Sequence, residues 1–322
     1  MRGVTLDLLL ARARHAGPRW LLVTAGLAVA AVLPVLAQAV TAVTADAALR
    51  QGLAALPPGR ASITVSYNGL PDPAQQRALD AAVTGQLPRV TGAAAHRELI
   101  FREISDGHGG SYTLGAADRL YTQVSLVSGR MPTTCTPTHC EVVALRLPGD
   151  PPLPRVSDLG LVVVGEAVRT DPLLLSGTFD PGPGHPVLLA DGVAAASGLA
   201  GLELFGRTFG WVAPLDLSRV RAGGVGGWVA ESAAIGDELW KQIPGLVLTV
   251  PGDVLRDEDA RARVSAGRFV VLGGATSVLL LGTAVVGGAA LRRDHEAFLG
   301  ALRRRGASRR RVAVLVGGEV GI

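Results

Sequence analysis

Cys135 and Cys140 are the two cysteines of the chain, and they stand together with His139 in the short sequence CTPTHC. Two cysteines that close a small loop in an oxidising compartment indicate a disulfide. The alternative is a metal site completed by His139, but this cluster supplies three ligands and no second cluster accompanies it. The spacing therefore favours a disulfide between Cys135 and Cys140, which would fix a local turn.

The remaining polar residues do not have the spacing of a catalytic or cofactor-binding motif. The sequence contains no G-x-x-x-x-G-K-[ST], G-x-S-x-G or H-E-x-x-H, and its single lysine, Lys241, lies outside any glycine loop. The run GGVGGW at 223–228 does not fit G-x-G-x-x-G and is interpreted as a flexible loop. The acidic run at 257–260 is typical of a solvated helix face. We therefore expect a non-enzymatic chain without a cofactor or a resident metal.

The charge distribution excludes a basic nucleic-acid-binding domain, although the pI is near 9.7. The basic charge gathers at two ends: residues 1–19 hold four arginines against Asp7, and residues 292–311 hold eight arginines against Asp294 and Glu296. The long middle, 46–268, has 19 basic and 23 acidic residues. With 48% hydrophobic and only 18% charged residues, the composition indicates a membrane protein.

Two apolar stretches are long enough to cross a membrane. Residues 20–45 form an uncharged run of 26 residues, and residues 269–291 form one of 23. A bilayer core needs about 20 apolar residues in a helix, and the Pro34 and glycines of these runs are tolerated in transmembrane helices. We therefore predict transmembrane helices at 20–45 and 269–291. Neither contains an ionisable residue, which disfavours an ion-coupled or proton-coupled transporter.

A cleaved signal peptide is the alternative for the first stretch. The triplets AQA at 37–39 and ADA at 45–47 resemble cleavage sites, so that a mature chain would begin after Ala39 or Ala47. The apolar run is longer than the usual signal-peptide core of about 7 to 15 residues, which favours an intact anchor.

The arginines beside both stretches predict one topology by the positive-inside rule. Residues 1–19 would be cytoplasmic, 46–268 extracytoplasmic and 292–311 cytoplasmic, in a multi-pass protein of the plasma membrane. The apolar run VAVLVGGEVGI at 312–322 would begin a third helix. The predicted fold class is an α-helical membrane protein with an α+β extracytoplasmic domain between the first two transmembrane helices.

The middle segment alternates strand-like and helical stretches. The predicted helices lie at 73–87, at 191–202 with Asp191 as N-cap, and at 253–267, the last of these polar and running directly into the second span. Gly/Pro-rich patches at 148–154 and 181–186 suggest a boundary between two subdomains within about 148–186. Strands are predicted where β-branched and aromatic residues gather, at 61–67, 98–104, 119–126, 141–147 and 161–168.

The segment RRDHEAFLGALRRRGASRRRVAVLVGGEVGI at 292–322 resembles the cytoplasmic loop and third-helix start of the FtsX-like and MacB-like permeases of ABC transporters. SGRMP at 128–132 before EVVAL at 141–145, and LVVVGEAV at 161–168, are similar to a succession common in the outer domains of that family. RTFGWVAPLD at 207–216 resembles a segment of the long actinobacterial-type permeases. Such permeases have at least four spans, so the resemblance implies that the sequence is a fragment or a truncated gene.

The resemblance implies a coupling segment, residues 292–311, that docks on a separate P-loop ATPase subunit. Leu299, Leu302 and Phe298 are spaced for one helical face that could enter a groove, while the arginines could meet acidic rims or lipid phosphates. Gly306 could end this helix. The alternative is a positive-inside cluster without a partner. The candidate coupling residues are Phe298, Leu299, Leu302, Arg303, Arg305, Gly306, Ala307, Ser308, Arg309 and Arg310.

The expected function is the permease subunit of an ABC transporter that couples ATP hydrolysis by its partner to movement of the extracytoplasmic domain. The resemblance also implies a second permease copy or a second half, surrounded by membrane lipid. Two alternatives come from other classes: a two-span sensor with a ligand-binding outer domain, and an anchored surface protein. A sensor would continue into a soluble relay helix, whereas residues 312–322 become apolar at once.

Overall fold

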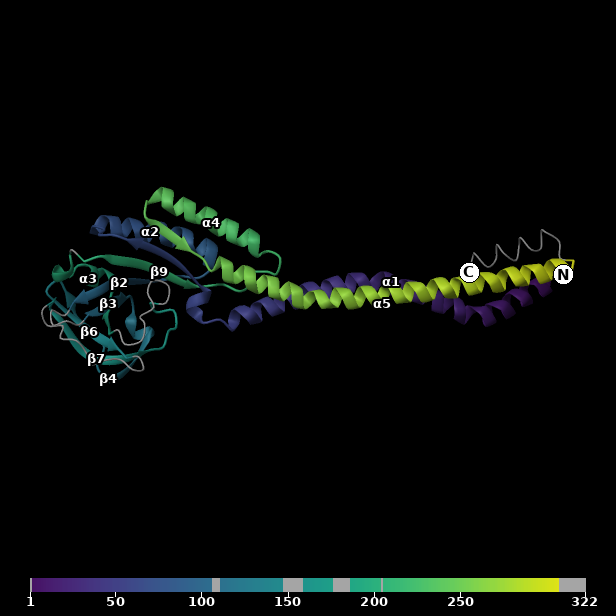
Figure 1. The fold of residues 1–322 in the computed structure, drawn as a ribbon, viewed down its shortest axis with the longest axis horizontal. Helices are drawn as coiled ribbons and strands as arrows, with labels where there is room; N and C mark the ends of the chain where they lie inside the picture. Colours follow the sequence, from purple (N-terminus) through teal and green to yellow (C-terminus); the bar gives the residue numbers. More distant parts are fainter. Residues whose placement is uncertain (1, 106–110, 147–158, 176–185, 204, 307–322) are drawn as a thin grey trace. The chain divides into compact units, whose positions relative to one another are not determined.

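The computed structural model describes residues 2–105, 111–146, 159–175, 186–203 and 205–306. The chain divides into two compact units, residues 1–47 with 262–322 and residues 48–261. We refer to them as the helical unit and the sheet unit. Two long helices, α1 (Arg2–Ala54) and α5 (Gly252–Arg304), contribute to both units (Figure 1).

The helical unit contains the apolar parts of α1 and α5. Two segments, Ala25–Ala54 and Gly252–Ala290, are long and apolar enough to cross a membrane by length and composition. They overlap most of the two predicted spans, 20–45 and 269–291. The polar stretch at 253–267 and the second apolar run belong to one helix, α5, as the sequence predicted.

The sheet unit is built on one mixed sheet, in which the strand order is β10-β1-β9-β2-β3-β8-β6-β7-β4 and β5 pairs with β6. Most neighbours are antiparallel, but β3 with β8 and β6 with β7 are parallel. The strands are β1 (Ser62–Asn68), β2 (His96–Ser105), β3 (Ser111–Ala117), β4 (Val124–Gly129), β5 (Cys135–Thr136), β6 (His139–Leu145), β7 (Leu161–Arg169), β8 (Val187–Asp191), β9 (Arg207–Pro214) and β10 (Leu246–Thr249).

Helices α2 (Pro73–Thr91) and α4 (Val225–Gln242) lie together beside the β9 and β10 side of the sheet (Figure 1). The start of α2 is capped by Asp72, whose carboxylate accepts from the N–H groups of Ala74 (2.8 Å) and Gln75 (2.7 Å). Its end is capped by Gly92 in the left-handed region, φ 68°. The short helices are η1 (Pro58–Ala61), η2 (Leu120–Thr122), α3 (Val193–Ser197) and η4 (Ala200–Leu202).

The central strands are buried on both faces, which gives them continuous apolar runs instead of alternating ones. In β3 and β6, each described residue after the first is buried. The core where these strands meet is formed by aliphatic side chains from six strands and the adjoining turns, including Ile100, Val143, Leu145, Leu175, Val187 and Leu189.

The sheet runs through the range in which the sequence suggested a subdomain boundary. Strand β8 follows that range, yet it pairs with β3 and with β6, which both precede it. Residues 48–261 accordingly form one compact unit. The Gly/Pro-rich patches at 148–154 and 181–185 lie outside the described residues.

Three local predictions were wrong. At 119–126, the strand begins only at Val124, because Arg119 adopts a left-handed conformation (φ 58°) and η2 follows it. At 191–202, α3 starts after Gly192 and breaks at Gly198, and the carboxylate of Asp191 accepts instead from the N–H of Leu120 (2.9 Å).

The third wrong prediction is the flexible loop at 223–228. This run opens α4, in which Val225, Ser232, Ile235 and Leu239 are buried at helical spacing. The buried face of the helix outweighs the low helix propensity of Gly226 and Gly227.

Candidate functional site

The two apolar helices of the helical unit pack closely through small residues. A Cβ atom added to Gly273 would lie 2.7 Å from the Cβ of Ala37, and one added to Gly287 would lie 3.2 Å from a methyl group of Val23. Small side chains let two helix backbones approach closely, which is how helices associate in lipid. Further small residues buried in this unit are Ala30, Ala45, Ala266, Ser277 and Ala284.

The outward faces of the same helices are covered by large apolar side chains. Val35 is 66% exposed, and Val271 is 72% exposed. A surface of this kind is costly in water and favourable against hydrocarbon. The other exposed members are Leu27, Val29, Val32, Leu36, Val40, Val43, Phe269, Val270, Leu272, Val278, Leu279, Leu281, Val285 and Val286.

Hydroxyl groups within the apolar stretches bond to their own helix. Thr41 donates to the carbonyl of Ala37 at 2.6 Å, and Ser277 donates to that of Gly273 at 2.8 Å. Thr44, Thr276 and Thr283 do the same with carbonyls three or four residues earlier. A hydroxyl paired in this way can lie in lipid without an unsatisfied donor.

The described part of the coupling segment continues α5 without a break. Residues 292–304 are helical, as expected for a helix within this segment that ends near Gly306. The physical reason is composition, because this stretch consists largely of Leu, Arg, Ala and Glu, which favour helix, and contains no proline. An ion pair one turn apart, Arg292 to Glu296 at 3.0 Å, adds support.

The helix ends where the sequence predicted. Gly306 adopts a left-handed conformation (φ 78°) and its N–H donates to the carbonyl of Arg303 at 3.1 Å. Arg303 and Arg305 are exposed, and Leu299 is half-buried. Phe298, Leu299 and Leu302 all have a helical backbone. Leu299 and Leu302 are three residues apart and therefore lie on neighbouring turns of α5. Ala307, Ser308, Arg309, Arg310 and the predicted third-helix start lie outside the described residues.

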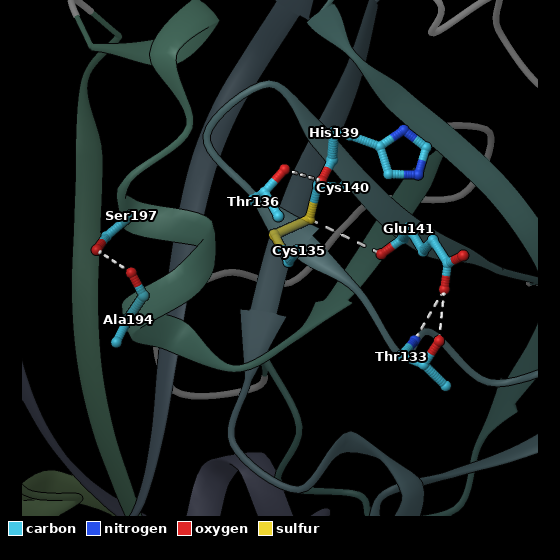
Figure 2. Close-up of a disulfide and its surroundings, with 8 residues drawn as sticks. All are labelled: Thr133, Cys135, Thr136, His139, Cys140, Glu141, Ala194 and Ser197. Atoms are coloured by element: carbon cyan, nitrogen blue, oxygen red, sulfur yellow. Dashed lines mark hydrogen bonds between the residues drawn. A yellow bond between two sulfur atoms is a disulfide. The ribbon is translucent and has the colours of Figure 1, made fainter.

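In the sheet unit, Cys135 and Cys140 are joined by a disulfide across the hairpin formed by β5 and β6 (Figure 2). A metal site at this position would need both thiolates, which the disulfide uses. The imidazole of His139 points away from the two sulfur atoms (Figure 2).

Next to the disulfide, the Glu141 carboxylate joins two segments that carried the family resemblance. The guanidinium of Arg130, from SGRMP, donates to both carboxylate oxygens, at 2.7 Å in the contact from Nη1 to Oε2. The backbone N–H and hydroxyl of Thr133 donate at 2.9 and 3.0 Å (Figure 2). The Arg130 side chain and the Thr133 donors hold the pKa of Glu141 well below its ordinary range.

A second polar cluster of the sheet unit was not predicted from the sequence. Arg97 on β2 forms ion pairs with Asp80 on α2 and with Asp118 after β3. The indole N–H of Trp211 donates to Asp80 at 3.1 Å, and the N–H of Val193 donates to Asp118 at 3.0 Å. These residues have no common spacing in the sequence, so only the pairing of β2 with its neighbours brings them together.

The comparisons with known proteins do not identify a family. No protein-family model matches the chain, and a search of the curated proteins finds no match.

Proposed function

We propose that this chain is a permease subunit of an ABC transporter of the FtsX/MacB mechanotransmission type. In this proposal α1 and α5 cross the plasma membrane, residues 1–19 and 292–311 are cytoplasmic, and the sheet unit is extracytoplasmic. The exposed apolar faces, the close glycine contacts and the self-paired hydroxyls all support the membrane location.

The single observation that carries the proposal is the continuity of α5 from Gly252 to Arg304. Its first turns belong to the sheet unit, where Leu255 is buried and the Asp259 carboxylate accepts from the N–H of Gly223 at 2.8 Å. The apolar span follows, and the arginine-rich coupling segment continues the same helix. A displacement of the coupling segment by a partner would therefore act on a helix that is anchored in the sheet unit.

The partner we propose is a P-loop ATPase, because this chain has no nucleotide-binding motif of its own. Leu299 and Leu302 would enter a groove of that partner, and the exposed Arg303, Arg304 and Arg305 would face its acidic rim or lipid phosphates. ATP-driven closure of the partner would shift α5 and so move the sheet unit. A second permease copy or half would complete the transporter.

The test is co-purification of the ATPase from native membranes with tagged chains. The variant Leu299→Asp/Leu302→Asp should lose the ATPase while still inserting in the membrane, because two carboxylates would be placed on the docking face. The matched control is Ala297→Asp, an exposed position on the same turns of α5. Unchanged co-purification with the double variant would refute the docking role of the two leucines.

The membrane location has a separate test. Single cysteines introduced at Ser197 and at Arg305 into a chain without its native cysteines should react with an impermeant maleimide from opposite sides of sealed vesicles. Labelling of both positions from the same side would contradict the proposed topology.

A further inference from the structure

A cavity of about 330 Å³ opens in the sheet unit between α2, the start of β2 and the turn after β3. Its size lies within the range of small-molecule sites, about 300 to 1,000 Å³. Its lining includes apolar side chains from two elements: Leu87 and Pro88 of α2, and Trp211 of β9. The polar cluster around Arg97 belongs to the same lining, and the indole N–H of Trp211 donates to its Asp80 at 3.1 Å, so apolar and charged groups lie next to each other.

The cluster of Asp80, Arg97 and Asp118 carries more negative than positive charge. One guanidinium, that of Arg97, serves two carboxylates: its Nε donates to Asp118 at 2.6 Å and its Nη1 donates to Asp80. The three side chains remain about a quarter to a third exposed, at 32% for Arg97, 24% for Asp80 and 29% for Asp118. A ligand in the cavity can therefore reach them.

The other titratable residues at the cavity do not cancel this excess. Burial lowers the pKa of His96, so its imidazole is neutral near pH 7. Arg119 lines the rim with an exposed side chain. Because this side chain is exposed to water, its charge acts more weakly on a ligand than the partly buried charges of Asp80 and Asp118.

Both carboxylates also have acceptor capacity beyond the donors described. An ionised carboxylate offers about four lone-pair sites. At Asp80 the donors are Arg97 and the indole of Trp211, and at Asp118 they are Arg97 and the N–H of Val193. A group that brings one positive charge and several N–H donors would complete this arrangement.

We propose that the cavity binds a protonated amine carried on an apolar body, with the ammonium at the carboxylates of Asp80 and Asp118 and the apolar part against Leu87, Pro88 and Trp211. The ion cluster orients the ammonium, and the apolar lining residues select against small inorganic cations. This proposal does not rest on the transporter function, because the cavity lies wholly within the sheet unit. Loss of ATPase co-purification and loss of amine binding are therefore separate results.

The experiment uses the full chain in lipid nanodiscs and two probes of nearly equal shape, benzylamine and benzyl alcohol. Dissociation constants are measured by saturation-transfer NMR. We expect saturable binding of benzylamine and binding of benzyl alcohol that is weaker by about tenfold or more, since the alcohol has no charge for the carboxylates.

Variants locate the site. Ala94→Trp should fill the cavity without touching the ion cluster and abolish benzylamine binding, whereas Ala233→Trp, at an exposed position on α4, should leave it unchanged. Asp80→Asn should weaken benzylamine binding by about tenfold through the lost charge. Equal affinity for the two probes, binding that survives Ala94→Trp, or the absence of saturable binding would each overturn the proposal, and none of these results depends on how well Asp80→Asn folds.

Discussion

The close contact between Gly273 and Ala37 gives the sharpest prediction about the helical unit. A Cβ at residue 273 would lie 2.7 Å from the Cβ of Ala37, whereas carbon atoms in contact prefer about 3.5 to 4.0 Å. The variant Gly273→Ala therefore requires the two helices to separate by roughly 1 Å. Overpacking of this kind costs typically about 1 to 3 kcal/mol.

The neighbouring glycine supplies a matched control. Gly274 has no neighbouring atom within 4 Å of an added Cβ, so Gly274→Ala changes helix propensity in the same way without a collision. We expect Gly273→Ala to be less stable than Gly274→Ala by about 1 to 3 kcal/mol. In the double variant Gly273→Ala/Ala37→Gly, the space is restored and the stability should recover.

The assay is reversible unfolding in detergent, followed by circular dichroism and by the fluorescence of a donor and acceptor pair on the two helices. Equal stabilities for the two alanine variants, or a double variant that is no more stable than Gly273→Ala alone, would refute the close packing through Gly273.

Three further predictions concern the sheet unit. Asp72→Ala removes the acceptor for two N–H groups at the start of α2 and should lower the unfolding free energy by about 1 kcal/mol in chemical denaturation, whereas Asp72→Ser should keep most of it. The stabilisation from Glu141 should be fully present above the unfolded-state pKa of about 4.3 and be lost as the pH falls toward the lower pKa of the folded state. The variant Glu141→Gln should therefore flatten the acid end of a plot of unfolding free energy against pH. An unchanged plot would contradict the role of Arg130. Opening the six-residue loop with Cys135→Ser/Cys140→Ser should cost about 2 kcal/mol, measured against the oxidised chain, and a chain equally stable under oxidising and reducing conditions would contradict it.

The long helices could be predicted from the sequence because their signals are strong and local. An uncharged run of more than 20 residues predicts a long apolar helix, and the polar stretch before the second run contains no proline. The same reasoning located the helix end at Gly306, since glycine adopts the left-handed conformation without strain. The disulfide between Cys135 and Cys140 could be predicted from the six-residue sequence CTPTHC alone.

The central strands were harder because their signals are short and depend on tertiary structure. Strand β3 contains Gly115, Ala116 and Ala117, which have low strand propensity, and it is stabilised by burial on both faces between β2 and β8. Strand β8 is only five residues long. Periodicity cannot assign runs of this kind, because doubly buried strands do not alternate between apolar and polar residues.

The polar cluster around Arg97 could not be predicted for the same reason, because its members come together only in the folded chain. Asp80, Arg97 and Asp118 lie on a helix, a strand and a turn, and each by itself resembles a solvated surface charge. The sheet register that places Arg97 opposite Trp211 is a long-range property, so no local window of the sequence contains it. The local disulfide could be predicted from the sequence, whereas the cluster that depends on the fold could not.

The docking of residues 292–311 on a P-loop ATPase is tested most directly by site-specific photo-crosslinking at residue 299 in native membranes. A photoreactive amino acid replaces Leu299, a second chain carries it at the exposed Val278 of the apolar span, and the products are identified by mass spectrometry. We expect a crosslink from residue 299, and not from residue 278, to a protein with a P-loop. Crosslinks from residue 299 to lipid alone would contradict a coupling role and leave the arginines as a topological anchor.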